Sequence, residues 1–392
     1  MITLIRNGMT YAPEPLGAKD ILVVGGKIAA LAGPGQIKIE GAPVKVLDAS
    51  GKTVLPGMVD SHVHILGGGG EGGPATRAPE INLEDIILNG VTTVIGCLGT
   101  DSVTRHMESL LAKARALEVE GVSSYIFSGA YDVPPKTITG NIRSDLVLID
   151  KVIGAGEIAV SDHRSSQPTF EEIARLAAEC RVGGMLGGKA GVLHLHIGDG
   201  RRKLEMLFRL VRETEIPITQ IIPTHVNRSA ELFEEAIAFA LEGGTFDITA
   251  FSEEEADKNS GLSTEKAIAI CLKRRVPLSQ ITVSSDSNGS IPIFDAAGHL
   301  VGLSIATERN LFLGFRSLVQ KKILLLEDAI RLFSTNPASF YSLSSKGKIE
   351  PGQDADLILF DKDLELSDVY CRGKRMMADG KLIARGTFKP LL

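Results

Sequence analysis

The sequence predicts an α/β fold: a (β/α)8 barrel of the TIM type with a small β-sandwich domain built from both chain ends. Eight short, apolar, β-rich runs occur between residues 56 and 340. Amphipathic helical segments separate these runs, a pattern typical of a parallel sheet. Both chain ends consist instead of alternating strand-like segments divided by glycine turns. We therefore expect residues 1–55 and 346–392 to form the β-sandwich domain and residues 56–345 to form the barrel.

The eight runs agree with a barrel in both number and length. They are MVDSHVHI, TTVIGCL, SSYIFSGAY, EIAVSDH, VLHLHIGD, IIPTHVN, FDITAFS and ITVSSDS, spread over about 285 residues. An open, doubly wound sheet is the structural alternative, but no G-x-G-x-x-G opens a helix after an early strand. Neither terminal segment could bury a core alone, so we expect the two segments to pair with each other.

Composition excludes several functional classes. The chain has 392 residues, 44% of them hydrophobic and 23% charged, with a net charge of -6. This acidity, without a basic patch interleaved with aromatic residues, argues against nucleic-acid binding. No apolar run of membrane-spanning length appears, and the strand-like N-terminus lacks a signal-peptide core. Cys97, Cys180, Cys271 and Cys371 show no C-x-x-C spacing, so we expect free, mostly buried thiols in the cytoplasm.

Metal-binding residue types stand at the carboxyl end of strand after strand. His62 and His64 share one side of the first strand, because side chains alternate with a period of two. Strand ends of a barrel converge on the face that holds the active site. Imidazole and carboxylate groups suit Zn²⁺ and related divalent ions, and a pair of such ions can polarise a carbonyl group. The predicted ligands are His62, His64, Glu157, His196, His225 and Asp286.

The motif P-G-x-x-D-x-H-x-H, present here as PGMVDSHVH at residues 56–64, resembles the marker of the amidohydrolase superfamily. The segments VHILGGGGEGGPATRAPE, SGAYDVPPKTITG and VSSDSNGS, among others along nearly the whole chain, are similar to isoaspartyl dipeptidases of that superfamily. The resemblance implies two Zn²⁺ ions per subunit, one held by His62 and His64 with Asp286. It assigns the second ion to His196 and His225. Asp286 would be the general base on a metal-bridging hydroxide and then the acid that protonates the leaving amine.

The chain departs from the family at the group that bridges the metals. The family carries a carboxylated lysine on the fourth strand, and alignment on SDHRS places Glu157 there. Glutamate supplies the same two-oxygen anion on a shorter side chain, so we expect Glu157 to be the bridge. Its alternative role is a supporting carboxylate beside the metals. A glutamate bridge needs no CO₂, so metal binding should not respond to bicarbonate.

A β-linked aspartyl dipeptide carries one ammonium and two free carboxylates around its scissile amide. A matching pocket needs one anion and two cationic clamps, and arginine suits carboxylates. The resemblance implies that Glu71 binds the ammonium, that Arg164 and Arg228 bind the carboxylates, and that Tyr131 stabilises the developing oxyanion. Further substrate contacts are expected from Gly69, Thr100 and Ser290.

We therefore expect a zinc metallopeptidase that hydrolyses β-aspartyl dipeptides, a small-molecule substrate class. A cyclic-amide hydrolase of the dihydroorotase or hydantoinase type is the alternative enzyme, but it has less reason for an ammonium-binding Glu71. A non-catalytic scaffold on the same fold would be expected to lose metal ligands, and here every ligand position is filled. The resemblance also implies a homo-oligomer, with an octamer as the expected form.

Overall fold

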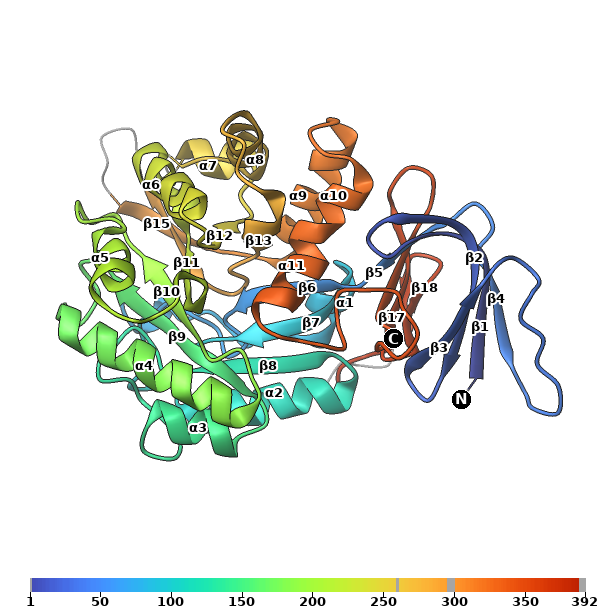
Figure 1. The fold of residues 1–392 in the computed structure, drawn as a ribbon, viewed down its shortest axis with the longest axis horizontal. Helices are drawn as coiled ribbons and strands as arrows, with labels where there is room; N and C mark the ends of the chain where they lie inside the picture. Colours follow the sequence, from blue (N-terminus) through green and yellow to red (C-terminus); the bar gives the residue numbers. More distant parts are fainter. Residues whose placement is uncertain (1, 259–260, 295–299, 388–392) are drawn as a thin grey trace.

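The computed structural model describes residues 2–258, 261–294 and 300–387. Within this part of the chain, eight parallel strands curve into a barrel surrounded by helices (Figure 1). Six of them form one sheet in the order β11-β10-β9-β8-β7-β6, and β12 pairs with β13. A bridge between Val63 and Ser287 joins the first and last strands. The barrel strands are β6 (Met58–Val63), β7 (Val91–Gly96), β8 (Ser123–Ser128), β9 (Val152–Val160), β10 (Val192–Ile197), β11 (Ile221–Thr224), β12 (Phe246–Thr249) and β13 (Ile281–Ser284).

The predicted fold class is confirmed, since all eight runs form barrel strands. The amphipathic segments between them form helices whose apolar faces cover the barrel. Helix α4, for example, begins with a capping box between Thr169 and Glu172, which satisfies two free backbone amides of the first turn. The helices are α1 (Leu83–Ile87), α2 (Met107–Glu120), α3 (Ile142–Leu148), α4 (Phe170–Gly187), α5 (Glu205–Glu213), α6 (Ala230–Leu241), α7 (Glu253–Lys258), α8 (Thr264–Lys273), α9 (Glu308–Gln320), α10 (Leu326–Ile330) and α11 (Asn336–Phe340).

Strands from the two chain ends lie side by side in a second sheet, blue and red in Figure 1. Strand β5 connects them, because it pairs with β1 on one side and with β16 on the other. Ile21, Val54 and Leu357 share one buried core, so neither segment needs a core of its own. The strands are β1 (Ile2–Tyr11), β2 (Pro15–Val24), β3 (Lys27–Ala32), β4 (Lys45–Asp48), β5 (Thr53–Pro56), β16 (Leu357–Phe360), β17 (Leu366–Cys371), β18 (Lys374–Ala378) and β19 (Lys381–Leu382).

A short antiparallel hairpin, β14 (Ser290–Phe294) with β15 (Leu300–Ile305), follows the last barrel strand. It places Ser290 close to the glycine-rich loop that follows β6: a Cβ built on Gly69 would lie 3.5 Å from the Ser290 Cβ.

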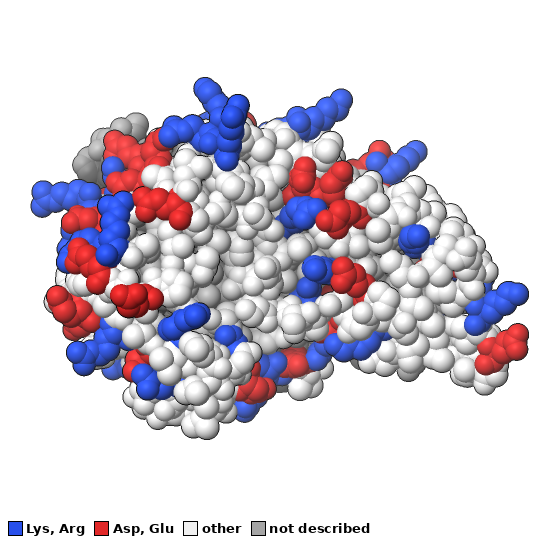
Figure 2. All heavy atoms as spheres, viewed as in Figure 1, with Lys and Arg blue, Asp and Glu red and all other residues white. Residues whose placement is uncertain are grey.

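The surface shows no single-sign field on the face drawn in Figure 2, where acidic and basic side chains are intermixed. Among the described residues, every helix is too short or too polar to cross a bilayer.

A buried ammonium group links the barrel to the terminal sheet. The Lys346 side chain is 2% exposed, and its Nζ lies 2.6 Å from Ser123 Oγ at the start of β8. The same Nζ lies 2.6 Å from Asp356 Oδ2 and 2.8 Å from Asp354 Oδ2, just before β16. Burial alone would lower the pKa of Lys346, but the charges of Asp356 and Asp354 outweigh burial and raise the pKa.

The variant Lys346→Met should lower the free energy of unfolding by about 3–5 kcal/mol, because it leaves buried carboxylates without their cation. Lys27→Met removes a half-exposed partner of the same Asp354 and should cost under about 1 kcal/mol. Because the pKa of Lys346 is raised in the folded protein, the Lys346 ammonium stabilises the fold fully at pH values below the ordinary lysine pKa of about 10.4. This contribution to the free energy of unfolding is lost as the pH rises through the raised pKa. Urea denaturation of the wild type and both variants at pH 8 and pH 11 measures these free energies of unfolding. Equal midpoints for the two variants at pH 8 would contradict this prediction.

Candidate metal centre

The six predicted metal ligands meet at the carboxyl end of the barrel. Glu157 and His196 lie within β9 and β10, whereas His64, His225 and Asp286 lie just beyond β6, β11 and β13. Five of the six residues are less than 10% exposed, and the Asp286 side chain is 15% exposed. The convergence of strand ends, which a barrel imposes, therefore brings together residues more than 220 positions apart.

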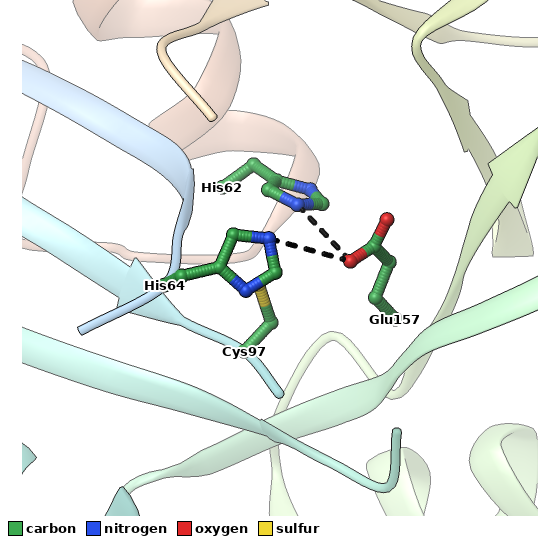
Figure 3. A group of neighbouring side chains, drawn as sticks. All are labelled: His62, His64, Cys97 and Glu157. Atoms are coloured by element: carbon green, nitrogen blue, oxygen red, sulfur yellow. Dashed lines mark hydrogen bonds and ion pairs between the residues drawn. The ribbon is translucent and has the colours of Figure 1, made fainter. Parts of the chain in front are cut away.

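Glu157 lies between two pairs of histidines. Its Oε2 is 3.4 Å from His62 Nε2 and 3.7 Å from His64 Nε2 (Figure 3). Its Oε1 is 2.5 Å from His196 Nδ1 and 3.1 Å from His225 Nε2. A carboxylate that directs one oxygen to each pair has the arrangement required of a bridging ligand.

Three buried polar atoms in this cluster have no hydrogen-bond partner among the described residues: His62 Nε2, Glu157 Oε2 and Asp286 Oδ1. The His62 nitrogen lies 3.4 Å from the Glu157 oxygen and 3.5 Å from the Asp286 oxygen. Unpaired buried polar atoms are rare and costly, and three that face one another form a place suited to a cation. Neutral imidazole with carboxylate is a donor set that fits a divalent metal.

The non-ligating nitrogen of three histidines is held by a neighbouring side chain. Such contacts fix the tautomer and direct the other nitrogen's lone pair toward a metal. In the hydrogen-bonding pattern that this requires, His62 Nδ1 donates to His194 Nε2 (2.8 Å), His225 Nδ1 donates to Thr249 Oγ1 (2.7 Å) and His196 Nε2 donates to Asp162 Oδ2 (3.0 Å).

The acidic groups around His62 favour positive charge there. Burial opposes ionisation of Glu157, but the charges of His62 and His196 and hydrogen bonds from the histidines hold its pKa well below the usual range. Burial also lowers the pKa of His62, yet Cys97 and Glu157 outweigh it and raise that pKa well above its ordinary value. At His225 burial outweighs the neighbouring carboxylates and lowers the pKa to about 3. The field that favours a proton on His62 also favours a metal cation.

Two predicted ligands have strained backbones. His225 and Asp286 adopt φ angles of 61° and 55°, in the left-handed region that non-glycine residues rarely occupy. Turns hold them there: Arg228 N donates to His225 O (3.1 Å), and Gly289 N donates to Asp286 O (2.9 Å). Strain of this kind concentrates at functional sites, where the surrounding structure enforces it.

Two lysines flank the Glu157 segment in sequence, and both are engaged elsewhere. Lys151 precedes β9 and pairs with Glu118. Lys189 follows α4, and its Nζ donates to the carbonyl oxygens of Leu146 (2.7 Å) and Ile149. The carboxylate between the histidine pairs is therefore that of Glu157.

Glu71, in the glycine-rich loop, gathers three of the predicted substrate-binding residues. Its Oε1 accepts hydrogen bonds from Thr100 Oγ1 (2.7 Å) and Arg164 Nη1 (3.4 Å), and its Oε2 accepts one from Ser290 Oγ (3.2 Å). Burial raises the pKa of Glu71, but these partners outweigh burial and lower it, so the group is an anion at neutral pH.

Arg164, Arg228 and Tyr131 border the His196 side of the centre. Arg164 forms a two-point contact with Asp162, through Nε to Oδ1 (3.0 Å) and Nη2 to Oδ2 (2.8 Å). Arg228 is more loosely placed, with Nη1 3.9 Å from Asp162 Oδ2. The Tyr131 hydroxyl lies 2.9 Å from His196 Nδ1. Burial and the charge of Glu157 raise the pKa of Tyr131 well above its ordinary value, so the hydroxyl keeps its proton.

The glycine-rich loop is held in a defined shape. Gly69 has a φ of 73°, and a Cβ there would lie 2.5 Å from Thr76 O, so only glycine fits. Arg105, 5% exposed, donates to the carbonyl oxygens of Leu66 (3.3 Å), Gly68 (2.8 Å) and Gly69 (3.3 Å). The loop therefore presents Glu71 from a backbone anchored at several points.

Three residues in or beside the cluster are absent from the predicted site residues: Cys97, Asp162 and His194. All four cysteines are free and buried, as predicted, but Cys97 lies within the metal cluster. Asp162 contacts both His196 and Arg164, and His194 contacts His62. His194 and His196 form a second His-x-His pair, a signal that the sequence did contain.

The amidohydrolase family model matches residues 53–383. The chain is 46% identical to a beta-aspartyl dipeptidase from Fervidobacterium islandicum AW-1, whose crystal structure holds the dipeptide beta-Asp-Leu. The two structures superpose with a TM-score of 0.90, and the match covers 97% of this chain and 98% of that one. Dihydropyrimidinase from Brevibacillus agri shares the fold with 17% identity and a TM-score of 0.68, over 98% of this chain and 97% of that one.

Among curated sequences, an allantoinase from Bacillus licheniformis is 26% identical over 441 aligned positions, covering 100% of this chain and 94% of the relative. The match to the family model extends from the last strand before the barrel into the terminal sheet, and so includes the whole cluster of histidines and carboxylates. The chain is a hydrolase of the amidohydrolase family.

Proposed function

We propose that the protein hydrolyses β-aspartyl (isoaspartyl) dipeptides with two zinc ions per chain. One observation carries the proposal: beside the histidine cluster, a fixed carboxylate, Glu71, lies next to the guanidinium of Arg164. This pair is complementary to the adjacent ammonium and carboxylate of a β-linked aspartyl residue. The 46% identical dipeptidase, solved with beta-Asp-Leu, supports the same substrate class.

In this proposal, His62, His64 and Asp286 would hold one ion and His196 and His225 would hold the other, with the Glu157 carboxylate between the two pairs of histidines. When bound, the metal pair polarises the scissile carbonyl and activates water at neutral pH. Asp286 carries the proton: its carboxylate takes it from water and delivers it to the leaving amine nitrogen. The Tyr131 hydroxyl donates to the carbonyl oxygen as negative charge develops there.

Arg164 and Arg228 bind the two substrate carboxylates, and Glu71 binds the ammonium, with contacts from Thr100, Ser290 and the Gly69 backbone. Free, buried thiols support a cytoplasmic location. Three apolar side chains on the packed helices α3 and α4, each more than 65% exposed, support self-association, for which we propose a homo-oligomer: Leu148, Met185 and Leu186.

Product release from three substrates tests the activity. The metal-loaded enzyme is incubated with β-Asp-Leu, α-Asp-Leu and dihydroorotate, and free leucine or carbamoyl-aspartate is measured. We expect β-Asp-Leu to be hydrolysed at least about 100-fold faster than the other two, because only its ammonium and carboxylate match the Glu71–Arg164 pair. Equal rates for α-Asp-Leu and β-Asp-Leu would overturn the assignment.

A cyclic-amide hydrolase is the second candidate function. The allantoinase that aligns over 100% of this chain favours it. A cyclic amide has no free ammonium and therefore gives Glu71 no partner. Preferential turnover of allantoin or dihydroorotate over β-Asp-Leu would establish this alternative.

The variant Glu157→Ala should lower the metal content from two ions to fewer than one per chain, because both histidine pairs lose their shared oxygen ligand. Metal analysis after gel filtration measures this, with the exposed Glu171→Ala as control. Added bicarbonate should change neither metal content nor rate in the wild-type enzyme. If Glu157→Ala retained both metal and activity, Glu157 would not be the bridge.

A further inference from the structure

The sulfur atom of Cys97 lies among the predicted metal ligands. The residue directly follows β7, and its side chain is buried, with 1% exposure. Its sulfur and one ligand-type atom from each of His62, His64 and Glu157 all lie within 4.8 Å of one another (Figure 3). Zinc–sulfur bonds of about 2.3 Å and zinc–nitrogen bonds of about 2.1 Å place ligands of one ion up to about 4.4 Å apart. The cluster is thus close to the size of one coordination shell.

Two atoms beside the sulfur are buried without a hydrogen-bond partner in the part of the chain that the structure describes, and a bound ion would satisfy both. His62 Nε2 and Glu157 Oε2, in side chains that are 0% and 1% exposed, have no hydrogen-bond partner among the described residues. The contacts of the sulfur itself are long, 3.7 Å to Val63 O and 3.8 Å to His64 Nδ1. Two buried atoms without partners and a weakly held thiol therefore occur in one place.

Charge balance favours a third anion in this shell. Two divalent ions would bring four positive charges, whereas the predicted ligands Glu157 and Asp286 supply two negative ones. The Asp162 carboxylate lies outside this shell, on the far nitrogen of His196. A thiolate from Cys97 would supply a third inside a buried site, where uncompensated charge is costly. Sulfur also prefers zinc and other soft ions over manganese or magnesium.

We propose that Cys97 binds the metal of the His62–His64 pair as a thiolate. The inference rests on the metal centre of the proposed function and goes beyond the ligand set that the sequence predicted. On binding, the S–H bond breaks, a metal–sulfur bond forms and the proton passes to the buffer. The competing possibility is that the thiol only supports the His64 ring through Nδ1 and never contacts the ion.

X-ray absorption at the zinc edge separates the two possibilities on the intact, zinc-loaded chain. We expect a sulfur shell at about 2.3 Å in the wild-type protein that is absent in Cys97→Ser. Cys180→Ser, which alters an equally buried thiol on α4, should keep this shell. Cobalt-loaded protein should show a thiolate-to-cobalt charge-transfer band with the same dependence on Cys97. Cys97→Ser should also release zinc to a chelator at least about 10-fold more readily than Cys180→Ser.

The outcomes distinguish this inference from the proposed function. A zinc-loaded wild-type protein with only nitrogen and oxygen neighbours, and no charge-transfer band with cobalt, overturns the role of Cys97 but leaves the metal centre intact. Thermal melting of Cys97→Ser checks that the variant is folded. If the variant does not fold, the wild-type spectrum still shows whether sulfur binds the zinc. A wild-type protein that binds no zinc overturns both proposals.

Discussion

Replacing Asp286 with asparagine should reduce kcat for β-Asp-Leu by about 10³- to 10⁴-fold, the largest single-residue effect we expect. The Asp286 carboxylate lies beside both histidines of the first pair, 3.1 Å from His64 Nε2 and 3.5 Å from His62 Nε2. Asparagine keeps an oxygen of the same shape toward a metal but cannot take a proton from water or give one to the amine. Rate should therefore fall much further than metal content.

Steady-state kinetics and metal analysis of the same preparation measure the two quantities together. Asp150→Asn, at a carboxylate that is 72% exposed and remote from the cluster, should leave both unchanged. An Asp286→Asn enzyme with full metal and more than a tenth of the wild-type kcat would show that another group carries the proton. Loss of the metal itself would assign Asp286 mainly to metal binding.

Replacing Glu71 with glutamine should lower kcat/KM for β-Asp-Leu by about 10²- to 10³-fold, because the substrate ammonium loses its charged, partly buried partner. N-succinyl-leucine supplies the comparison, since it is β-Asp-Leu without the ammonium. The wild-type enzyme should prefer β-Asp-Leu strongly, and Glu71→Gln should lose most of that preference. The kcat/KM for N-succinyl-leucine should change less than about threefold.

The exposed Glu80→Gln, in the same connection between β6 and α1, is the matched control and should behave as the wild type. The ratio of kcat/KM for the two substrates is the measurement that matters, because loss of loop structure would lower both values together. If Glu71→Gln reduced both substrates equally, the residue would shape the loop rather than select an ammonium.

The sequence determined the fold class and the grouping of the six predicted metal ligands. The alternation of apolar β-rich runs with amphipathic segments is a local property, set by the periods of strand and helix, so it was readable without coordinates. The ligand set followed from one geometric rule, that parallel strand ends converge on one face of a barrel. His62 and Asp286 could be grouped in this way although 224 positions separate them.

Only the tertiary structure decided which groups support the ligands. His194 lies 132 positions from His62, and Asp162 lies 34 positions from His196, yet each holds the non-ligating nitrogen of its partner. No periodicity encodes such pairs, because they depend on how side chains from different strands pack. Cys97 stands near the carboxyl end of the apolar run TTVIGCL, where the strand-end rule also applied, but its spacing did not distinguish it from the three other scattered cysteines. Its place beside His62, His64 and Glu157 arises only when β6, β7 and β9 curve into the barrel.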